Sequence, residues 1–220
     1  MDTDRLVDSL VDDLEPVRAL RPAWLRAAGW LSIGSLAVGG IVLLAGPRAD
    51  LSEKLLDGSF LSQEVAMIAT AAVGSWAALC AVIPGSARAI PWIPVLPLLG
   101  WLISMGQQYL SELAEFGSAG LTVGMDPQCI PGIAMAGSVP LLAMIVMLRK
   151  GAGCNGAIAV FWGTLASAAL ANAGLRLFHM VDGALMVIVW QFGTVLAFTA
   201  LSTFASGRLV PSRIPTALTT

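Results

Sequence analysis

Charged side chains are scarce in this sequence of 220 residues. Asp, Glu, Lys and Arg together make up 12% of the chain, whereas a soluble domain is about a quarter charged. Hydrophobic residues make up 57%, so most of the folded surface must face something other than water. The formal net charge of -2 gives no case for nucleic acid as a direct partner.

Cysteine and histidine are also few. The three cysteines, Cys80, Cys129 and Cys154, are too scattered for a disulfide framework or a zinc site. His179 is the one histidine, which excludes a His-rich metal site or a histidine proton relay. No Ser/His/Asp, HExxH, Walker or GxGxxG arrangement appears in the sequence. We therefore expect a protein that is not an enzyme and that binds no cofactor.

Long apolar segments are abundant in the chain. A helix needs roughly 20 apolar residues to cross a bilayer, and six uncharged segments come close to this length. They predict an all-α, polytopic bundle of six transmembrane helices. In the third segment Pro91, Pro94 and Pro97 are expected to kink or delay the helix. The predicted spans are Ala27–Ala45, Val65–Ile83, Ile90–Met105, Ile130–Leu148, Ala157–Leu175 and Ala184–Phe204.

The Lys and Arg residues predict the orientation of these spans. If the N-terminus is cytoplasmic, nine of them lie on the cytoplasmic side: Arg5, Arg18, Arg21, Arg26, Arg88, Arg149, Lys150, Arg208 and Arg213. Three then lie outside: Arg48, Lys54 and Arg176. The positive-inside rule favours this arrangement, with both termini cytoplasmic. The chain then divides into a cytoplasmic segment (1–22), a transmembrane domain (23–206) and a cytoplasmic tail (207–220).

Small residues recur along the fifth span. Gly163, Ser167 and Ala171 repeat every four residues, which favours close helix packing within the bundle or, alternatively, a homodimer face. A small transporter or channel is a second candidate function. It is disfavoured because the predicted spans contain no charged residue and the sequence shows no internal repeat.

The first fifteen residues predict an acidic amphipathic helix that ends at Pro16. Its apolar stripe consists of Leu6, Val7, Leu10, Val11 and Leu14, and its acidic residues include Asp8, Asp12, Asp13 and Glu15. Anionic lipid repels such a helix, so a groove on a partner protein is the favoured binding site. The alternative is that the helix packs on the protein's own basic loops, which carry Arg88, Arg149 and Lys150.

Reactive side chains gather on the outer side of the predicted topology. Cys129 precedes the fourth span, and Arg176, His179 and Asp182 lie between the fifth and sixth. A thiol near a histidine could ligate a soft metal or be oxidised, or it could be an inert packed cysteine. A third alternative, an enzyme with Cys129 as nucleophile and His179 as base, has no sequence signature.

The order of short motifs along the chain resembles the NrsF-type negative regulators of sigma factor F, a family of six-helix bacterial inner-membrane proteins. The resemblance runs over nearly the whole chain. After the N-terminal helix it rests on PVRALRP (16–22), GPRADL (46–51), Cys129, LRLFH (175–179), ALM (184–186) and Trp190.

This resemblance implies an anti-sigma factor that holds an extracytoplasmic-function sigma factor at the membrane until oxidant or heavy metal releases it. Residues 4–14 would bind the sigma factor, and Cys129 would belong to the sensor. Members often carry a second outer cysteine directly after the histidine, and Met180 takes that place here. A simple disulfide switch is therefore disfavoured, whereas Cys129, His179 and Met180 could form a different sensor, because methionine is oxidisable and a soft ligand.

Overall fold

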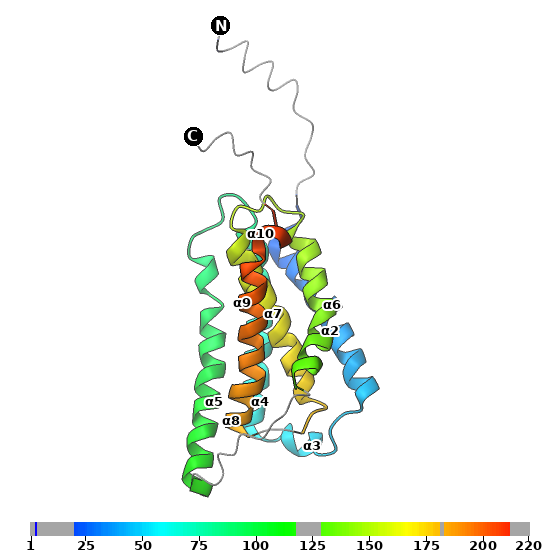
Figure 1. Cartoon of the computed structure of the whole chain (residues 1–220), viewed down its shortest axis with the longest axis vertical. Coiled ribbons are helices and arrows are strands. Elements are labelled where there is room, and N and C mark those ends of the chain that lie inside the picture. Colours follow the sequence, from blue (N-terminus) through cyan, green and yellow to red (C-terminus); the bar gives the residue numbers. More distant parts are fainter. Residues whose placement is uncertain (1–2, 4–19, 118–128, 181–182, 212–220) are drawn as a thin grey trace.

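The six predicted spans form one helical bundle (Figure 1). The computed structural model describes Thr3 and residues 20–117, 129–180 and 183–211. No strand occurs in these parts of the chain, which confirms the all-α prediction. Six helices are long and apolar enough to cross a membrane. They are α2 (Ala23–Ala45), α4 (Gly58–Ala81), Ile90–Phe116 with α5 (Val95–Phe116), α6 (Cys129–Leu148), α7 (Gly156–Arg176) and Ala184–Phe204 with α9 (Gly193–Phe204).

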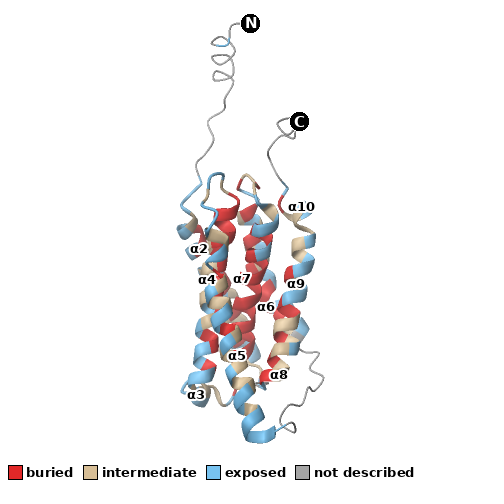
Figure 2. Cartoon of the chain, turned by 90° about the vertical axis from the view of Figure 1, so that its left-hand side faces the viewer, coloured by how far each residue is buried: buried red, intermediate tan, exposed pale blue. Residues whose placement is uncertain are grey.

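Helix α7 lies at the centre of the bundle and packs against α2, α4, α6 and α9 (Figures 1 and 2). Its many small residues let these neighbours approach closely. A Cβ added to Gly163 would lie 2.8 Å from Met144 of α6, and Gly137 of α6 lies against Ala171. The stripe of Gly163, Ser167 and Ala171 is thus buried inside the bundle, so the homodimer alternative for this stripe is wrong.

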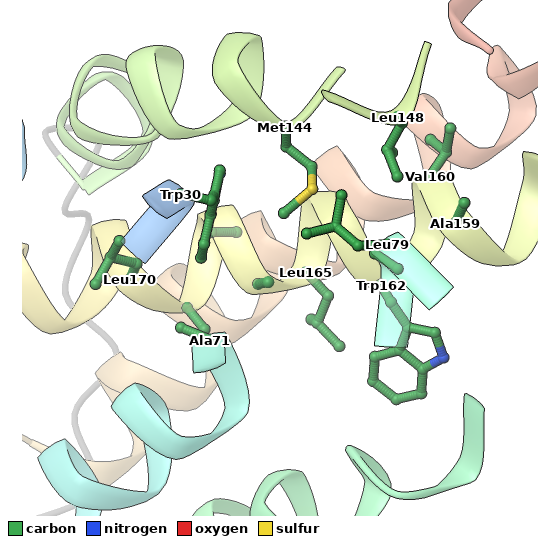
Figure 3. Packing of buried hydrophobic residues seen from close by; sticks show 14 of the residues in the cluster. Trp30, Ala71, Leu79, Met144, Leu148, Ala159, Val160, Trp162, Leu165 and Leu170 are labelled. Atoms are coloured by element: carbon green, nitrogen blue, oxygen red, sulfur yellow. The ribbon is translucent and has the colours of Figure 1, made fainter. Parts of the chain in front are cut away.

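The core side chains come from helices that are far apart in the sequence. Figure 3 shows Met144 of α6, Leu165 of α7 and Leu79 of α4 in one cluster, with Trp30 of α2 beside them. The Trp30 indole is fully buried and donates a hydrogen bond of 2.8 Å to the carbonyl of Pro140, a proline inside α6. A buried indole N–H requires such a partner, so this bond fixes where α2 crosses α6.

The third span begins late, as its prolines predict. A short 3-10 helix η1 (Ile90–Trp92) precedes it, and α5 starts at Val95 directly after Pro94. It continues eleven residues past Met105, the predicted end, to Phe116. Trp101 and Met105 are its buried residues, so α5 lies at the edge of the bundle, against α4.

The sixth span is not one uniform α-helix. One turn, α8 (Ala184–Met186), leads into a π-helical stretch, η3 (Val187–Phe192), and then into α9. The π-helix has a wider turn than the α-helix and occurs mostly as short insertions. The apolar pattern of the sequence did not predict it.

The bundle has two ends, which we name by what lies there. The terminal end carries the start of α2 and the short helix α10 (Ser206–Leu209). The α3 end carries α3 (Leu51–Lys54), α8 and the C-terminus of α7. Both described chain ends therefore lie at the same end of the bundle, as an even number of spans requires.

Two predicted boundaries are wrong in a way that matters for the site. Helix α4 begins at Gly58 instead of Val65, and α7 ends at Arg176 instead of Leu175. These extensions bring Glu64 and Arg176 into the helices, although the predicted spans held no charged residue. Arg26 likewise falls within α2, which begins at Ala23.

Candidate functional site

The predicted partner-binding residues, Leu6, Val7, Asp8, Leu10, Val11, Asp12 and Leu14, lie outside the described residues. Asp182 of the predicted sensor lies outside them as well. The other predicted sensor residues lie at the ends of two helices. Cys129 is the first residue of α6, and His179 and Met180 follow the end of α7.

The start of α6 and the end of α7 pack together at the α3 end. A Cβ on Gly132 of α6 would lie 2.9 Å from Cδ1 of Leu175 on α7, so the Leu175 side chain packs directly against the α6 backbone here. Cys129 comes one turn before Gly132, and His179 comes one turn after Leu175. The two sensor residues therefore belong to adjoining segments, although their joint role stays a prediction.

His179 is held by the last turn of α7, and Met180 next to it is exposed. The His179 backbone N–H donates to the Leu175 carbonyl at 2.8 Å, which continues the last turn of α7. The Met180 side chain is 66% exposed, so a solvent-borne oxidant can reach it. Among the described residues, no group of three or more His, Cys, Asp and Glu side chains is placed to hold a metal ion.

Arg48 ties the loop after α2 to the C-terminus of α7. Its Nη1 lies 3.4 Å from the carbonyl oxygens of both Arg176 and His179, and its backbone N–H donates to the Leu177 carbonyl at 2.9 Å. A cation at a helix C-terminus is favourable because the last carbonyls carry partial negative charge.

Asp50 holds the Arg48 guanidinium in this position. Its two carboxylate oxygens accept hydrogen bonds of 2.6 and 2.8 Å from Arg48. These bonds hold the pKa of the Asp50 carboxyl below its usual range. The Arg48 side chain is almost completely buried, whereas Asp50 keeps contact with solvent.

Arg176 is buried at the end of α7, with 2% of its surface exposed. Its Nη1 donates to Gln63 Oε1 at 2.6 Å, and its Nε lies 3.5 Å from Glu64 Oε1. The ring of Phe60 lies 4.6 Å from the guanidinium carbon, which adds a cation–π contact. Helix α4 thus supplies a hydrogen bond, an ion pair and a cation–π contact to a single cation on α7.

The polar contacts continue from α4 to α5 and on to the sixth span. Gln63 Nε2 donates to Gln108 Oε1 at 2.7 Å, and Gln108 Nε2 donates to Glu112 Oε1 at 2.7 Å. The Glu112 carboxylate in turn accepts from the Ala184 backbone N–H, at 3.0 Å for the shorter contact. A negative charge suits this helix start. We call the set the α3-end polar network: Arg48, Asp50, Gln63, Glu64, Gln108, Glu112 and Arg176.

The α3-end polar network links four of the six spans to the segment that carries His179. A change of charge or position at that segment can therefore reach α4, α5 and the sixth span through direct contacts. Part of this network is visible in the sequence. Glu64 and Arg176 adjoin the predicted spans, but nothing in the spacing shows that they meet.

The terminal end is held by contacts to backbone carbonyls. Arg26 Nη2 donates to the Met147 carbonyl at 2.6 Å, and Arg149 Nε donates to the Leu209 carbonyl at 2.7 Å. Six described Lys and Arg residues lie at this end, against three at the α3 end. The six are Arg21, Arg26, Arg88, Arg149, Lys150 and Arg208.

A sequence model of one protein family, described as "Negative regulator of sigma F" and named NrsF, matches residues 10–211. The match includes all six long helices and both ends of the bundle. Neither the curated proteins nor the solved structures contain a match to this chain. Because the family match covers most of the sequence, the chain belongs to the NrsF family of negative regulators of sigma F.

Proposed function

We propose that this protein is a bacterial inner-membrane anti-sigma factor that sequesters an extracytoplasmic-function sigma factor through residues 4–14. The observation that carries the proposal is the family match over residues 10–211, which makes a sigma factor the partner. An acidic, apolar-striped segment suits a sigma factor, because such proteins offer basic surfaces that face nucleic acid. Opposite charges also speed the encounter of the two proteins.

The distribution of basic residues supports a cytoplasmic location for this segment. The terminal end carries six described Lys and Arg residues and the α3 end carries three, as the positive-inside rule requires for a cytoplasmic terminal end. Residues 4–14 precede Leu20 at that end. The α3 end then faces the periplasm, where an envelope oxidant or heavy metal would arrive.

We assign the sensor to Cys129, His179 and Met180 at the α3 end. A signal that moves the segment after α7 also moves the carbonyls that Arg48 contacts, and with them the α3-end polar network. To shift the sigma factor from 99:1 bound to 1:99, the signal must change the balance by roughly 5.5 kcal/mol. This is a large demand on one oxidised side chain, so several inputs or partial release are favoured.

Co-purification tests the sequestration. The full-length protein and a form that lacks residues 1–15 would each be expressed with the sigma factor encoded beside it. We expect the full-length protein to retain the sigma factor and the truncated form to lose it. The matched control lacks residues 212–220, which also adjoin the terminal end, and should retain the sigma factor. Retention by the form without residues 1–15 would overturn the assignment of this segment.

A reporter gene for the released sigma factor tests the sensor. Cys129→Ser and Met180→Leu should each weaken the response to oxidant or heavy metal while leaving repression intact without stress. Cys80→Ser is the matched control, because this cysteine is buried near the terminal end and should not sense the signal. An unchanged response in a Cys129→Ser, Met180→Leu double variant would rule out this sensor.

A further inference from the structure

Two adjoining cavities lie at the terminal end, between the loop after α4 and the start of α7. The first, which we call the polar chamber, has a volume of about 230 Å³ and is lined by Ser86, Arg88 and Asn155 among others. The second, the apolar chamber, has a volume of about 500 Å³ and is lined by Trp92, Phe161 and Trp162 among others. Arg88, Pro91 and Ile158 line both, so the two chambers adjoin.

The polar chamber has the features of an anion site. Among the described residues, the side chains of Ser86, Arg88 and Asn155 donate no hydrogen bond to the protein, so all three are available to a ligand. Helix α7 begins at Gly156, beside this chamber, and the Asn155 side chain does not cap it. The free N–H groups of its first turn carry partial positive charge, which adds to the charge of Arg88.

The apolar chamber has the features of an acyl-chain site. Its wall on α7 runs over the first two turns of that helix, from Ala157 to Trp162. The Trp162 ring extends away from Met144 and Leu148 of the core (Figure 3). Trp92 is 73% exposed beside it, as is typical of the aromatic residues at a membrane interface.

We propose that the two chambers together bind one anionic phospholipid, with its phosphate at Arg88 and an acyl chain against Phe161 and Trp162. A single phospholipid carries a negative group and an apolar chain at adjoining positions, which matches the order of the chambers. The site does not depend on sigma-factor binding, and its failure would leave the proposed function untouched.

The main competing occupant is the protein's own acidic N-terminal segment. Its apolar stripe could enter the apolar chamber, but its aspartates would then be drawn toward the turns of α7 that cross the membrane. Carrying an aspartate into a membrane-spanning segment is unfavourable. A phospholipid has its apolar part free of charge, so the observations favour the lipid.

Native mass spectrometry of the full-length protein tests the proposal. The protein in detergent would be mixed with phosphatidylglycerol or with phosphatidylcholine of identical chains. We expect preferential retention of one phosphatidylglycerol. Arg88→Gln should weaken this retention about fivefold, since one basic residue near a membrane surface contributes about 1 kcal/mol. Arg149→Gln is the matched control and should not weaken it, because Arg149 lies at the same end but outside both chambers.

Three further measurements make the test decisive. Ala157→Trp narrows the apolar chamber and should weaken retention, with the melting temperature showing that the variant is folded. Phosphatidylglycerol with bromine on its chains should quench tryptophan fluorescence, and Trp92→Phe should lower the quenched fraction. Equal retention of the two lipids, or retention that Arg88→Gln does not change, would overturn the proposal. Displacement of the lipid by inorganic phosphate, or by a peptide of residues 1–15, would overturn it too.

Discussion

The pairing of Glu64 with Arg176 gives a sharp test of how the α3 end is held. Glu64→Gln preserves the shape of the side chain on α4 but removes the negative charge that lies 3.5 Å from Arg176 Nε. Arg176 is 2% exposed and Glu64 is 6% exposed, so water cannot replace the lost charge. Breaking a buried ion pair from one side costs about 3–5 kcal/mol. Gln63 and Phe60 still contact the guanidinium, so we expect the lower value, about 3 kcal/mol.

Unfolding in SDS mixed micelles, followed by far-UV circular dichroism, measures this change in the free energy of unfolding. The matched control is Glu115→Gln, which removes the same charge from an exposed position on α5 and should change the free energy by at most about 0.5 kcal/mol. Glu64→Leu combined with Arg176→Met removes both charges and should recover much of the loss, because no unpaired charge stays buried.

The reasoning would fail on a simple result. If Glu64→Gln and Glu115→Gln unfold at the same SDS concentration, then the Glu64 charge contributes nothing to the buried cation. If the double variant is less stable than Glu64→Gln, then Arg176 stabilises the bundle through its other contacts, and the ion pair is not what holds the end of α7.

Two further outcomes follow from packing and from charge. Gly174→Ala should destabilise the bundle by about 1–3 kcal/mol, because the new Cβ would clash with a methyl carbon of Val38. Gly39→Ala, whose Cβ would meet nothing within 4 Å, serves as the control in the same SDS assay. A stable Gly174→Ala variant would mean that α2 and α7 do not approach this closely. Asp50, whose pKa is lowered by its hydrogen bonds from Arg48, should stabilise the fold fully above the unfolded-state pKa of about 3.9. That stability is lost as the pH falls through the lower folded-state pKa. The free energies of unfolding of wild type and Asp50→Asn should therefore differ at pH values above about 4 and converge in stronger acid. A difference that persists in acid would contradict the charge argument.

The sequence predicted the number of spans because a membrane helix requires a long apolar segment that is easily recognised. It also predicted the late start of the third span. Pro94 has no backbone N–H, so a helix that began well before it would lack one of its backbone hydrogen bonds. The predicted ends of α4 and α7 lie too far inward because charged residues normally mark the boundary of a membrane span. Glu64 and Arg176 are within helices because each neutralises the other, and that pairing depends on the arrangement of α4 and α7 in space.

Other features cannot be predicted from the local sequence pattern. The stripe of Gly163, Ser167 and Ala171 showed close packing correctly, but only the bundle shows that the close neighbour is α6 instead of a second copy. The π-helical stretch Val187–Phe192 has the same apolar composition as an α-helix. The partner-binding and sensor roles remain predictions, because they depend on a partner and a signal.

The central position of α7 has a consequence for how the protein is made. Helices α2, α4 and α6 precede α7 in the chain, yet each of them packs against it. During membrane insertion, four spans therefore enter the bilayer before the helix that they share has been synthesised. A ribosome that stops after Leu148 leaves the inserted helices without their common partner, so mature packing must wait for the fifth span. Nascent chains of intermediate length should therefore be the ones that membrane proteases remove.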